Sequence, residues 1–116
     1  MLFRSVIAVP AAFTPSEIYT QLAWGADIVK VFPAVTVGPS YFRQLAGPLG
    51  ALPLMAVGGV NAENAQEFIK CGCPYLGVGS GMFRRADVSR GDPERLRADV
   101  EAFEMAVRLQ IGRAHV

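Results

Sequence analysis

The sequence of 116 residues is poor in the side chains on which metal, disulfide and histidine chemistry depend, with one histidine and two cysteines. Cys71 and Cys73 form a C-x-C pair that lacks the second ligand pair of a zinc site, and the histidine, His115, lies in the tail. We expect the cysteines to be buried free thiols in a reducing cytoplasm. The sequence therefore predicts no metal, no cofactor and no disulfide scaffold.

The sequence also lacks long apolar runs and a large net charge. No run approaches the about 20 residues that span a bilayer, and no signal peptide is visible. Eleven Lys and Arg residues face ten Asp and Glu residues, without a basic tract or interleaved aromatic residues. We therefore expect neither a membrane nor a nucleic acid as partner, and a cytoplasmic location. A hydrophobic content of 52% and a charged content of 18% indicate a folded chain.

What the sequence does contain is a regular alternation of apolar runs and amphipathic segments. The apolar runs show little alternation and predict strands buried on both faces of a sheet, at Val6–Val9, Ile28–Phe32, Pro53–Val57 and Tyr75–Gly79. Thr14–Glu17 has the pattern of a capping box with Pro at the first helical position, so a helix begins there and ends at Gly25. Further helices are predicted at Pro39–Ala46, at Ala62–Cys71 with Asn61 as the N-cap, and from Asp92 onward with Leu96, Val100, Phe103 and Val107 on one face.

Four β/α units in succession predict an α/β fold with a parallel sheet and right-handed crossovers. Such a chain is either a small doubly wound sheet or half of a (β/α)8 barrel, which usually needs roughly 250 residues. We treat residues 1–116 as one domain.

Lys30 is the first residue that indicates chemistry, because it lies inside the apolar run Ile28–Phe32. A lysine in a central strand either reaches out to water or has a desolvated ammonium group with a lowered pKa. A desolvated lysine is the usual amine for a Schiff base with a carbonyl compound. On spacing alone, a solvated lysine at the end of a strand is the more common outcome. The other lysine, Lys70, is expected on the surface of a helix.

Two glycine-rich loops follow the last two predicted strands, Gly58–Gly59 and Gly77–Gly81. Glycine lets backbone N–H groups approach a phosphate, and barrels commonly build a phosphate site from the loops after strands seven and eight. No acidic residue stands at the carboxyl end of a predicted strand, and Asp27 precedes its strand. The general base that Schiff-base chemistry needs is therefore not evident.

Together these motifs resemble those of one family, the 2-dehydro-3-deoxy-6-phosphogluconate (KDPG) and 4-hydroxy-2-oxoglutarate aldolases. The resemblance rests on Thr14–Glu17, Val29–Ala34, Gly58–Val60 and Gly77–Ser80, and it covers nearly the whole chain. It implies a class I aldolase on a TIM barrel, a (β/α)8 fold that is usually trimeric in this family, which cleaves its substrate to pyruvate and an aldehyde such as glyceraldehyde 3-phosphate. This chain would supply strands five to eight.

The resemblance also implies roles for single residues. Lys30 falls on the Schiff-base lysine and Phe32 on a residue that lines the pyruvate pocket. The phosphate-binding positions fall on Gly58, Gly59, Gly79 and Ser80. The family's catalytic glutamate and a substrate-binding arginine lie on early strands that this chain lacks. Where the family usually has Pro-Thr before the Gly pair, this chain has Ala56–Val57, as in the phosphogalactonate-specific branch.

The two ends of the chain invite a separate hypothesis. Residues 110–116 can be encoded by a common sequencing-adapter sequence, and residues 1–5 by its opposite strand if GTG is the start codon. We therefore expect native-like sequence from about residue 6 to about residue 109, with frayed, non-native tails.

A half barrel exposes two sheet edges and the side chains that would face the missing strands, so we expect self-association into a homo-oligomer, or aggregation. The leading hypothesis is the C-terminal half of an aldolase that binds a 2-keto acid or sugar phosphate and turns over poorly alone. One alternative is a non-catalytic half barrel that binds sugar phosphates, with Lys30 merely a charge. Another is a different phosphate-binding barrel enzyme, such as a thiamine-phosphate synthase or epimerase relative.

Overall fold

The computed structural model describes residues 5–114, with side chains as far as residue 109. Four strands form one parallel sheet in the order β1-β2-β3-β4, so each strand pairs with the next one along the chain. The strands are β1 (Ala11–Ala12), β2 (Val29–Val31), β3 (Leu54–Val57) and β4 (Tyr75–Gly77). The helices are α1 (Pro15–Ala23), α2 (Ala34–Val37), α3 (Pro39–Leu49), α4 (Ala65–Lys70), α5 (Arg85–Arg90) and α6 (Pro93–Ala114). The predicted parallel β/α organisation is confirmed.

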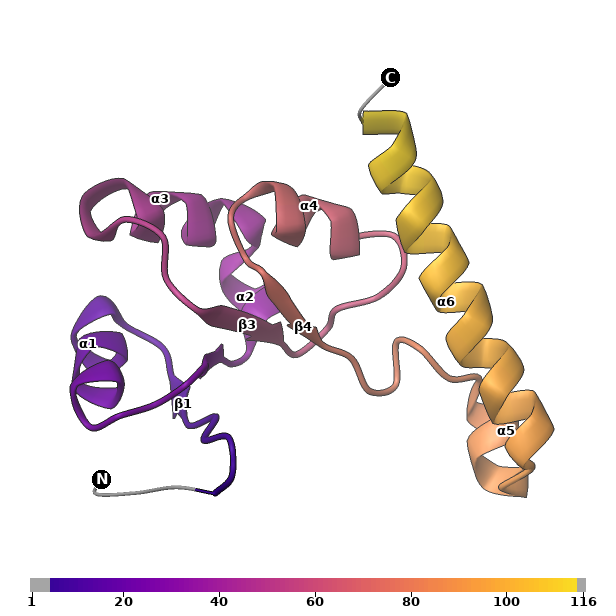
Figure 1. The fold of residues 1–116 in the computed structure, drawn as a ribbon. Helices are drawn as coiled ribbons and strands as arrows, with labels where there is room; N and C mark the ends of the chain where they lie inside the picture. The colour runs from indigo at the N-terminus through magenta and orange to yellow at the C-terminus, as the bar shows by residue number, and fades with distance from the viewer. Residues whose placement is uncertain (1–4, 115–116) are drawn as a thin grey trace.

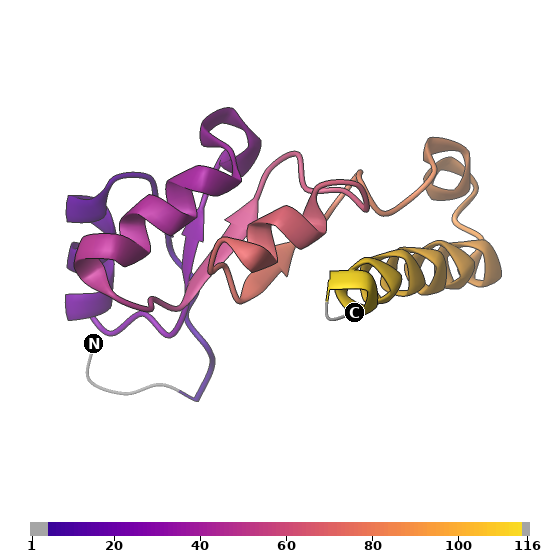
Figure 2. The same ribbon diagram turned by 90° about the horizontal axis from the view of Figure 1, so that it is seen from above.

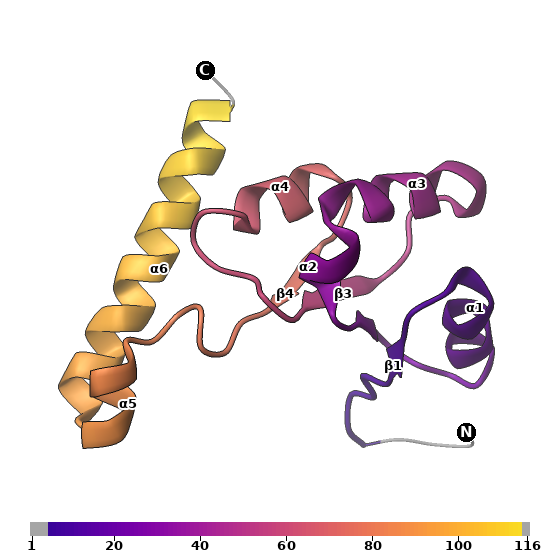
Figure 3. The same cartoon turned by 180° about the vertical axis from the view of Figure 1, so that it is seen from behind.

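The helices lie on one side of the sheet and at its ends. Figures 1 and 3 show α3 and α4 next to each other along β3 and β4, with α1 beside the other end of the sheet. Figure 2, seen from above, shows α5 and α6 extending beyond the body that the strands and the other helices form. The four residues predicted for the apolar face of α6, Leu96, Val100, Phe103 and Val107, are half-buried, as is Ala106.

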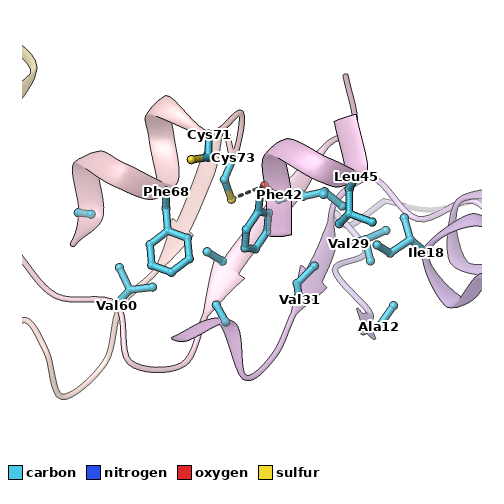
Figure 4. Packing of buried hydrophobic residues seen from close by; sticks show 14 residues of the cluster. Ala12, Ile18, Val29, Val31, Phe42, Leu45, Val60, Phe68, Cys71 and Cys73 are labelled. Atoms are coloured by element: carbon cyan, nitrogen blue, oxygen red, sulfur yellow. Dashed lines mark hydrogen bonds between the residues drawn. The ribbon is translucent and has the colours of Figure 1, made fainter. Parts of the chain in front are cut away.

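The core lies between the sheet and the helices. Val29 and Val31 of β2 are fully buried, because alternate residues of a strand point to the same face. Figure 4 shows them with Ile18 of α1 and with the aromatic rings of Phe42 from α3 and Phe68 from α4. The two rings pack edge to face with centroids 5.6 Å apart. This core holds the sheet and the helix layer together.

The opposite side of the sheet carries a row of residues that we call the open face: Ala11, Lys30, Met55 and Tyr75. They occupy one register line across the four strands, with Lys30 paired to Ala11 on one side and to Met55 on the other. The neighbouring residues of β1, β2 and β3 that point to the helices are buried, and Leu76 of β4 is half-buried, whereas these four are half-buried or exposed. The side chain of Lys30 therefore belongs to the face away from the core.

The first predicted strand is displaced from its expected position. We predicted a strand over Val6–Val9, but β1 comprises Ala11–Ala12, and Val6 and Ile7 are each 72% exposed. The preceding segment still runs beside the start of β2, because the Ala8 carbonyl oxygen accepts hydrogen bonds from the N–H groups of Asp27 and Ile28. Since β1 is an edge strand, the apolar side chains before it have no second neighbour to cover them.

The helices also differ in part from the prediction. The helix predicted over Ala62–Cys71 is shorter, since residues 62–64 form a turn and α4 begins at Ala65. Helices α2 and α5 were not predicted. The backbone of 110–114 belongs to α6, and the fraying of the tails stays a prediction. Residues 1–4 and 115–116, including His115, lie outside the described residues. The non-native origin of the two tails stays a prediction.

Candidate active site

The two glycine-rich loops meet at the carboxyl ends of β3 and β4, where they enclose a cavity of about 390 Å³. All four predicted phosphate-binding residues line it. The complete lining is Val57, Gly58, Gly59, Val60, Asn61, Gly77, Gly79, Ser80 and Gly81. This lining offers backbone amides, a hydroxyl and a side-chain amide, and it contains no acidic side chain. Such a surface suits an anion, which is repelled by carboxylates and bound by N–H and O–H donors.

The loop after β3 is fixed by a reciprocal pair of asparagines. The Asn64 N–H donates to Asn61 Oδ1, and the Asn61 N–H donates to Asn64 Oδ1, both at 2.9 Å. The prediction that Asn61 is the N-cap is therefore wrong: the N-cap of α4 is Asn64, and Asn61 instead closes the turn before the helix. The Asn64 side chain also donates from Nδ2 to the carbonyl oxygen of Gly59 at 3.0 Å. Sequence reasoning missed Asn64, which the capping-box spacing of Asn61 and Asn64 would have revealed.

The loop after β4 lies directly against the loop after β3. A Cβ atom added at Gly81 would collide with the carbonyl oxygen of Val60 and would lie 3.2 Å from Asn61 Cα. Gly77 is equally confined, since its added Cβ would lie 2.6 Å from Val57 Cγ2. The lack of a side chain at these two glycines therefore allows the two segments to approach each other closely.

The Gly pair after β3 has a left-handed backbone, with φ of +106° at Gly58 and +79° at Gly59. Residues other than glycine rarely adopt such angles. A Cβ on Gly58 would lie 3.0 Å from the Phe32 ring, and one on Gly59 would lie 2.5 Å from Val35 Cγ1. The Val35 N–H donates to the Gly58 carbonyl oxygen at 3.0 Å. The loop is thus packed against the residues that follow β2.

Lys30 and Phe32 come from the same strand and its extension. The Lys30 Nζ atom lies 5.9 Å from the centroid of the Phe32 ring, within the range of a cation–π contact. Lys30 is half-buried, and the Phe32 side chain is 54% exposed. The same ring lies 3.0 Å from the position that a Cβ atom of Gly58 would occupy, so Phe32 borders both the amine and the cavity lining, although neither Lys30 nor Phe32 lines the cavity itself. The structure thus places all six predicted site residues in two adjacent groups.

The two cysteines are buried and free, as predicted. Burial raises the pKa of the Cys73 thiol to about 11, although hydrogen bonds to backbone groups oppose part of that shift. The thiol is 3.4 Å from the carbonyl oxygen of Leu54, within the core that Figure 4 shows. A protonated, buried thiol is a poor nucleophile, so the pair has a packing role.

The two buried carboxyl groups among the described residues lie away from the cavity. Asp87 of α5 and Asp99 of α6 are buried together, at 4% and 8% exposure. Desolvation raises the pKa of Asp87, and the neighbouring Asp99 raises it further, while Arg95 and Arg84 lower it. The Asp99 Oδ1 atom is 3.9 Å from Nε of Arg84. This cluster joins α5 to α6 and does not reach the open face.

Residues 5–114 hold no group of three or more His, Cys, Asp or Glu side chains that could bind a metal ion. None of the helices in the same range is long and apolar enough to cross a membrane.

Comparison with known proteins places these motifs in context. The sequence profile of a family described as KDPG and KHG aldolase matches residues 2–98. The 2-dehydro-3-deoxy-6-phosphogalactonate aldolase of Escherichia coli K12 is 34% identical over 100 residues, which are 85% of this chain and 49% of that protein. A thiamine-phosphate synthase of Nitrosococcus oceani is 33% identical over 72 residues, covering 55% of this chain and 33% of the synthase. The chain spans about half the length of the curated aldolases that it matches.

A solved structure described as native KDPGal superimposes with a TM-score of 0.70 and 33% identity, over 89% of this chain and 50% of that one. A 4-hydroxy-2-oxoglutarate aldolase/2-deydro-3-deoxyphosphogluconate aldolase from TTHB1 gives a TM-score of 0.66 at 26% identity, over 85% and 47% of the two chains. These likenesses confirm the predicted fold class, four β/α units of a TIM-barrel-type protein.

Proposed function

The chain belongs to the KDPG and KHG aldolase family, and from that premise we propose that it is the lysine-bearing half of a class I aldolase. Its substrate is a 2-dehydro-3-deoxy-6-phospho sugar acid of the gluconate or galactonate series, or 4-hydroxy-2-oxoglutarate. Cleavage releases pyruvate and an aldehyde such as glyceraldehyde 3-phosphate. The observation that carries the proposal is the position of Lys30 on the open face beside Phe32, whose ring lies close to Gly58 of the cavity lining.

The proposed reaction begins with attack of the neutral Lys30 amine on the carbonyl carbon of the 2-keto acid, with loss of water. The resulting iminium accepts the electron pair of the carbon–carbon bond as the hydroxyl of the substrate loses its proton and the aldehyde departs. Protonation of the enamine and hydrolysis then return pyruvate and the free amine. The step needs a base, and none of the ten Asp and Glu residues lies on a strand. We propose that the base belongs to the half of the barrel that this chain does not span.

The cavity is proposed to hold the phosphate of the substrate. Backbone N–H groups near Gly59 and Gly79, with the hydroxyl of Ser80, supply donors without opposing carboxylates. The substrate would then lie across Phe32, with its carbonyl toward Lys30 and its phosphate toward the loops. Phosphate held in this way orients the carbonyl for attack, which is where much of the rate enhancement in such reactions originates.

Borohydride trapping tests the proposal. The chain is mixed with pyruvate and sodium borohydride, and the intact mass is measured for the wild type, Lys30→Arg and Lys70→Arg. Lys70 is an exposed helix residue and serves as the matched control. We expect a reduced adduct on the wild type and on Lys70→Arg, and none on Lys30→Arg. An adduct that persists in Lys30→Arg would refute the assignment of the amine.

The similarity to a thiamine-phosphate synthase favours a second candidate, a half barrel that binds phosphate esters without forming a Schiff base. The cavity would serve this function as well as the first. The candidates differ in the trapping experiment: a phosphate-binding module forms no adduct with pyruvate yet still binds inorganic phosphate. A wild-type chain that binds phosphate but gives no adduct, even when mixed with the missing half of an aldolase, would favour this second function.

A further inference from the structure

Gly58 lines the proposed phosphate cavity, yet its closest contacts are on the side of the amine. A Cβ atom at this position would lie 3.0 Å from Phe32 Cδ2 and 3.0 Å from Pro33 Cα. The same Phe32 ring lies 5.9 Å from Lys30 Nζ. Any side chain larger than hydrogen at Gly58 must therefore displace the ring or the backbone beside it.

The neighbouring contacts show that this packing is part of a wider junction. The Val35 N–H donates to the Gly58 carbonyl oxygen at 3.0 Å, and Val35 fills the space above Gly59. Figure 3 shows α2, which contains Val35, against β3 at the point where the loop leaves the strand. The segment that follows Lys30 and the loop that follows β3 are thus held as one unit.

Gly79, on the other side of the cavity, has quite different surroundings. A Cβ atom there would meet no heavy atom of the protein within 4 Å, and Gly79 does not have a left-handed backbone. The fold itself therefore does not require glycine at this position. The two glycines line one cavity, but only Gly58 is constrained by neighbouring atoms.

We propose that Gly58 is a positioning residue for the Schiff-base amine: its missing side chain lets the Phe32 ring lie over Lys30. Gly79 and Ser80, in contrast, serve the anion. This inference rests on the proposed function of Lys30, and it divides the glycine-rich lining into an amine-side part and an anion-side part. Both parts must be in place for a substrate that carries a carbonyl at one end and a phosphate at the other.

The matched variants Gly58→Ala and Gly79→Ala test the division. Two quantities are measured for each: the rate of borohydride trapping of pyruvate at Lys30, and the dissociation constant for inorganic phosphate. We expect Gly58→Ala to slow trapping by on the order of tenfold, because small displacements of a reacting group have effects of this size. Gly79→Ala is expected to weaken phosphate binding while trapping continues at the wild-type rate. Equal effects of both substitutions on both quantities would overturn the proposal.

A double-mutant cycle with Phe32→Leu separates positioning from a general loss of structure. Phe32→Leu alone removes the ring without straining the backbone, so it should slow trapping as Gly58→Ala does. In the Phe32→Leu background, Gly58→Ala should then have a smaller effect, because the ring is gone and only the left-handed backbone and the approach to Pro33 Cα remain. A loss of trapping by Gly58→Ala that is the same in both backgrounds would refute a role through Phe32.

The labelling rate of the amine gives a readout that does not depend on aldolase chemistry. Lys30 and Lys70 are labelled with an amine-reactive reagent over a range of pH, and Lys70 serves as the internal reference. We expect Gly58→Ala to change the ratio of the two rates, and to change it less in the Phe32→Leu background. If the wild type traps no pyruvate, the proposed function fails, and an unchanged labelling ratio overturns the positioning role separately.

Discussion

Phe68 is the residue by which α4 joins the core, and its truncation should be among the most destabilising single changes in the chain. Its side chain is fully buried, and its ring packs at 86° to that of Phe42 with centroids 5.6 Å apart. Removal of a buried phenylalanine ring costs about 3–5 kcal/mol, of which such an aromatic pair contributes about 0.5–1.5 kcal/mol beyond the buried area. A domain of this size has a free energy of unfolding of roughly 6–17 kcal/mol. Phe68→Ala should therefore remove a large share of the free energy of unfolding.

Urea denaturation followed by far-ultraviolet circular dichroism measures this loss. Phe32→Ala is the matched control, because it deletes the same ring from a side chain that is 54% exposed. The control should change the free energy of unfolding by less than about 1 kcal/mol. If Phe68→Ala and Phe32→Ala lowered the stability equally, α4 would not be docked on the sheet as described, and the position of the loop before it would lose its support.

Three further predictions follow from particular residues. Thr14→Ala removes the side chain that accepts a hydrogen bond from the Glu17 N–H, and should cost about 1 kcal/mol in urea denaturation; an unchanged midpoint would contradict the capping role. Cys73, with its pKa of about 11, should react with iodoacetamide at pH 8 far more slowly in the folded chain than in urea, and equal rates would show that it is not buried. The raised pKa of Asp87 stabilises the fold at pH values below that of a free aspartate, near 3.8, and this stabilisation is lost as the pH rises through the folded-state pKa. Asp87→Asn should therefore gain stability relative to the wild type between pH 4 and pH 7, and a parallel pH dependence of the two proteins would refute this.

The parts of the fold that could be predicted from the sequence are those set by local rules. The capping box at Thr14 determines where α1 begins, and the structure contains both of its hydrogen bonds. The apolar runs around Lys30 and before Gly58 contain the observed strands β2 and β3, because central parallel strands are buried and therefore almost entirely apolar. The two glycine-rich loops were predicted to share a site because the carboxyl ends of successive parallel strands lie at one edge of the sheet.

The parts that could not be predicted depend on contacts between distant residues. As an edge strand, β1 pairs with a neighbour on one side only. Because of this edge position, β1 comprises Ala11–Ala12 and not the predicted run. The reciprocal bonds of Asn61 and Asn64 make a turn where continuous helix was expected. The contact of Gly58 with the Phe32 ring likewise joins two segments that are far apart in the sequence. No local sequence pattern predicts this proximity, although Gly58 and Phe32 were each predicted as site residues on other grounds.

The central claim, that Lys30 is the amine of an aldolase site, is tested most directly by peptide mapping of the chain after reduction in the presence of pyruvate. The chain has only two lysines, so the result is a comparison between two peptides. The account predicts that the reduced adduct lies on the Lys30 peptide, and that its yield falls when the neighbouring Phe32 is replaced by Leu. An adduct distributed equally over Lys30 and Lys70 would contradict it, because the amine on the open face would then be no more reactive than an exposed surface lysine.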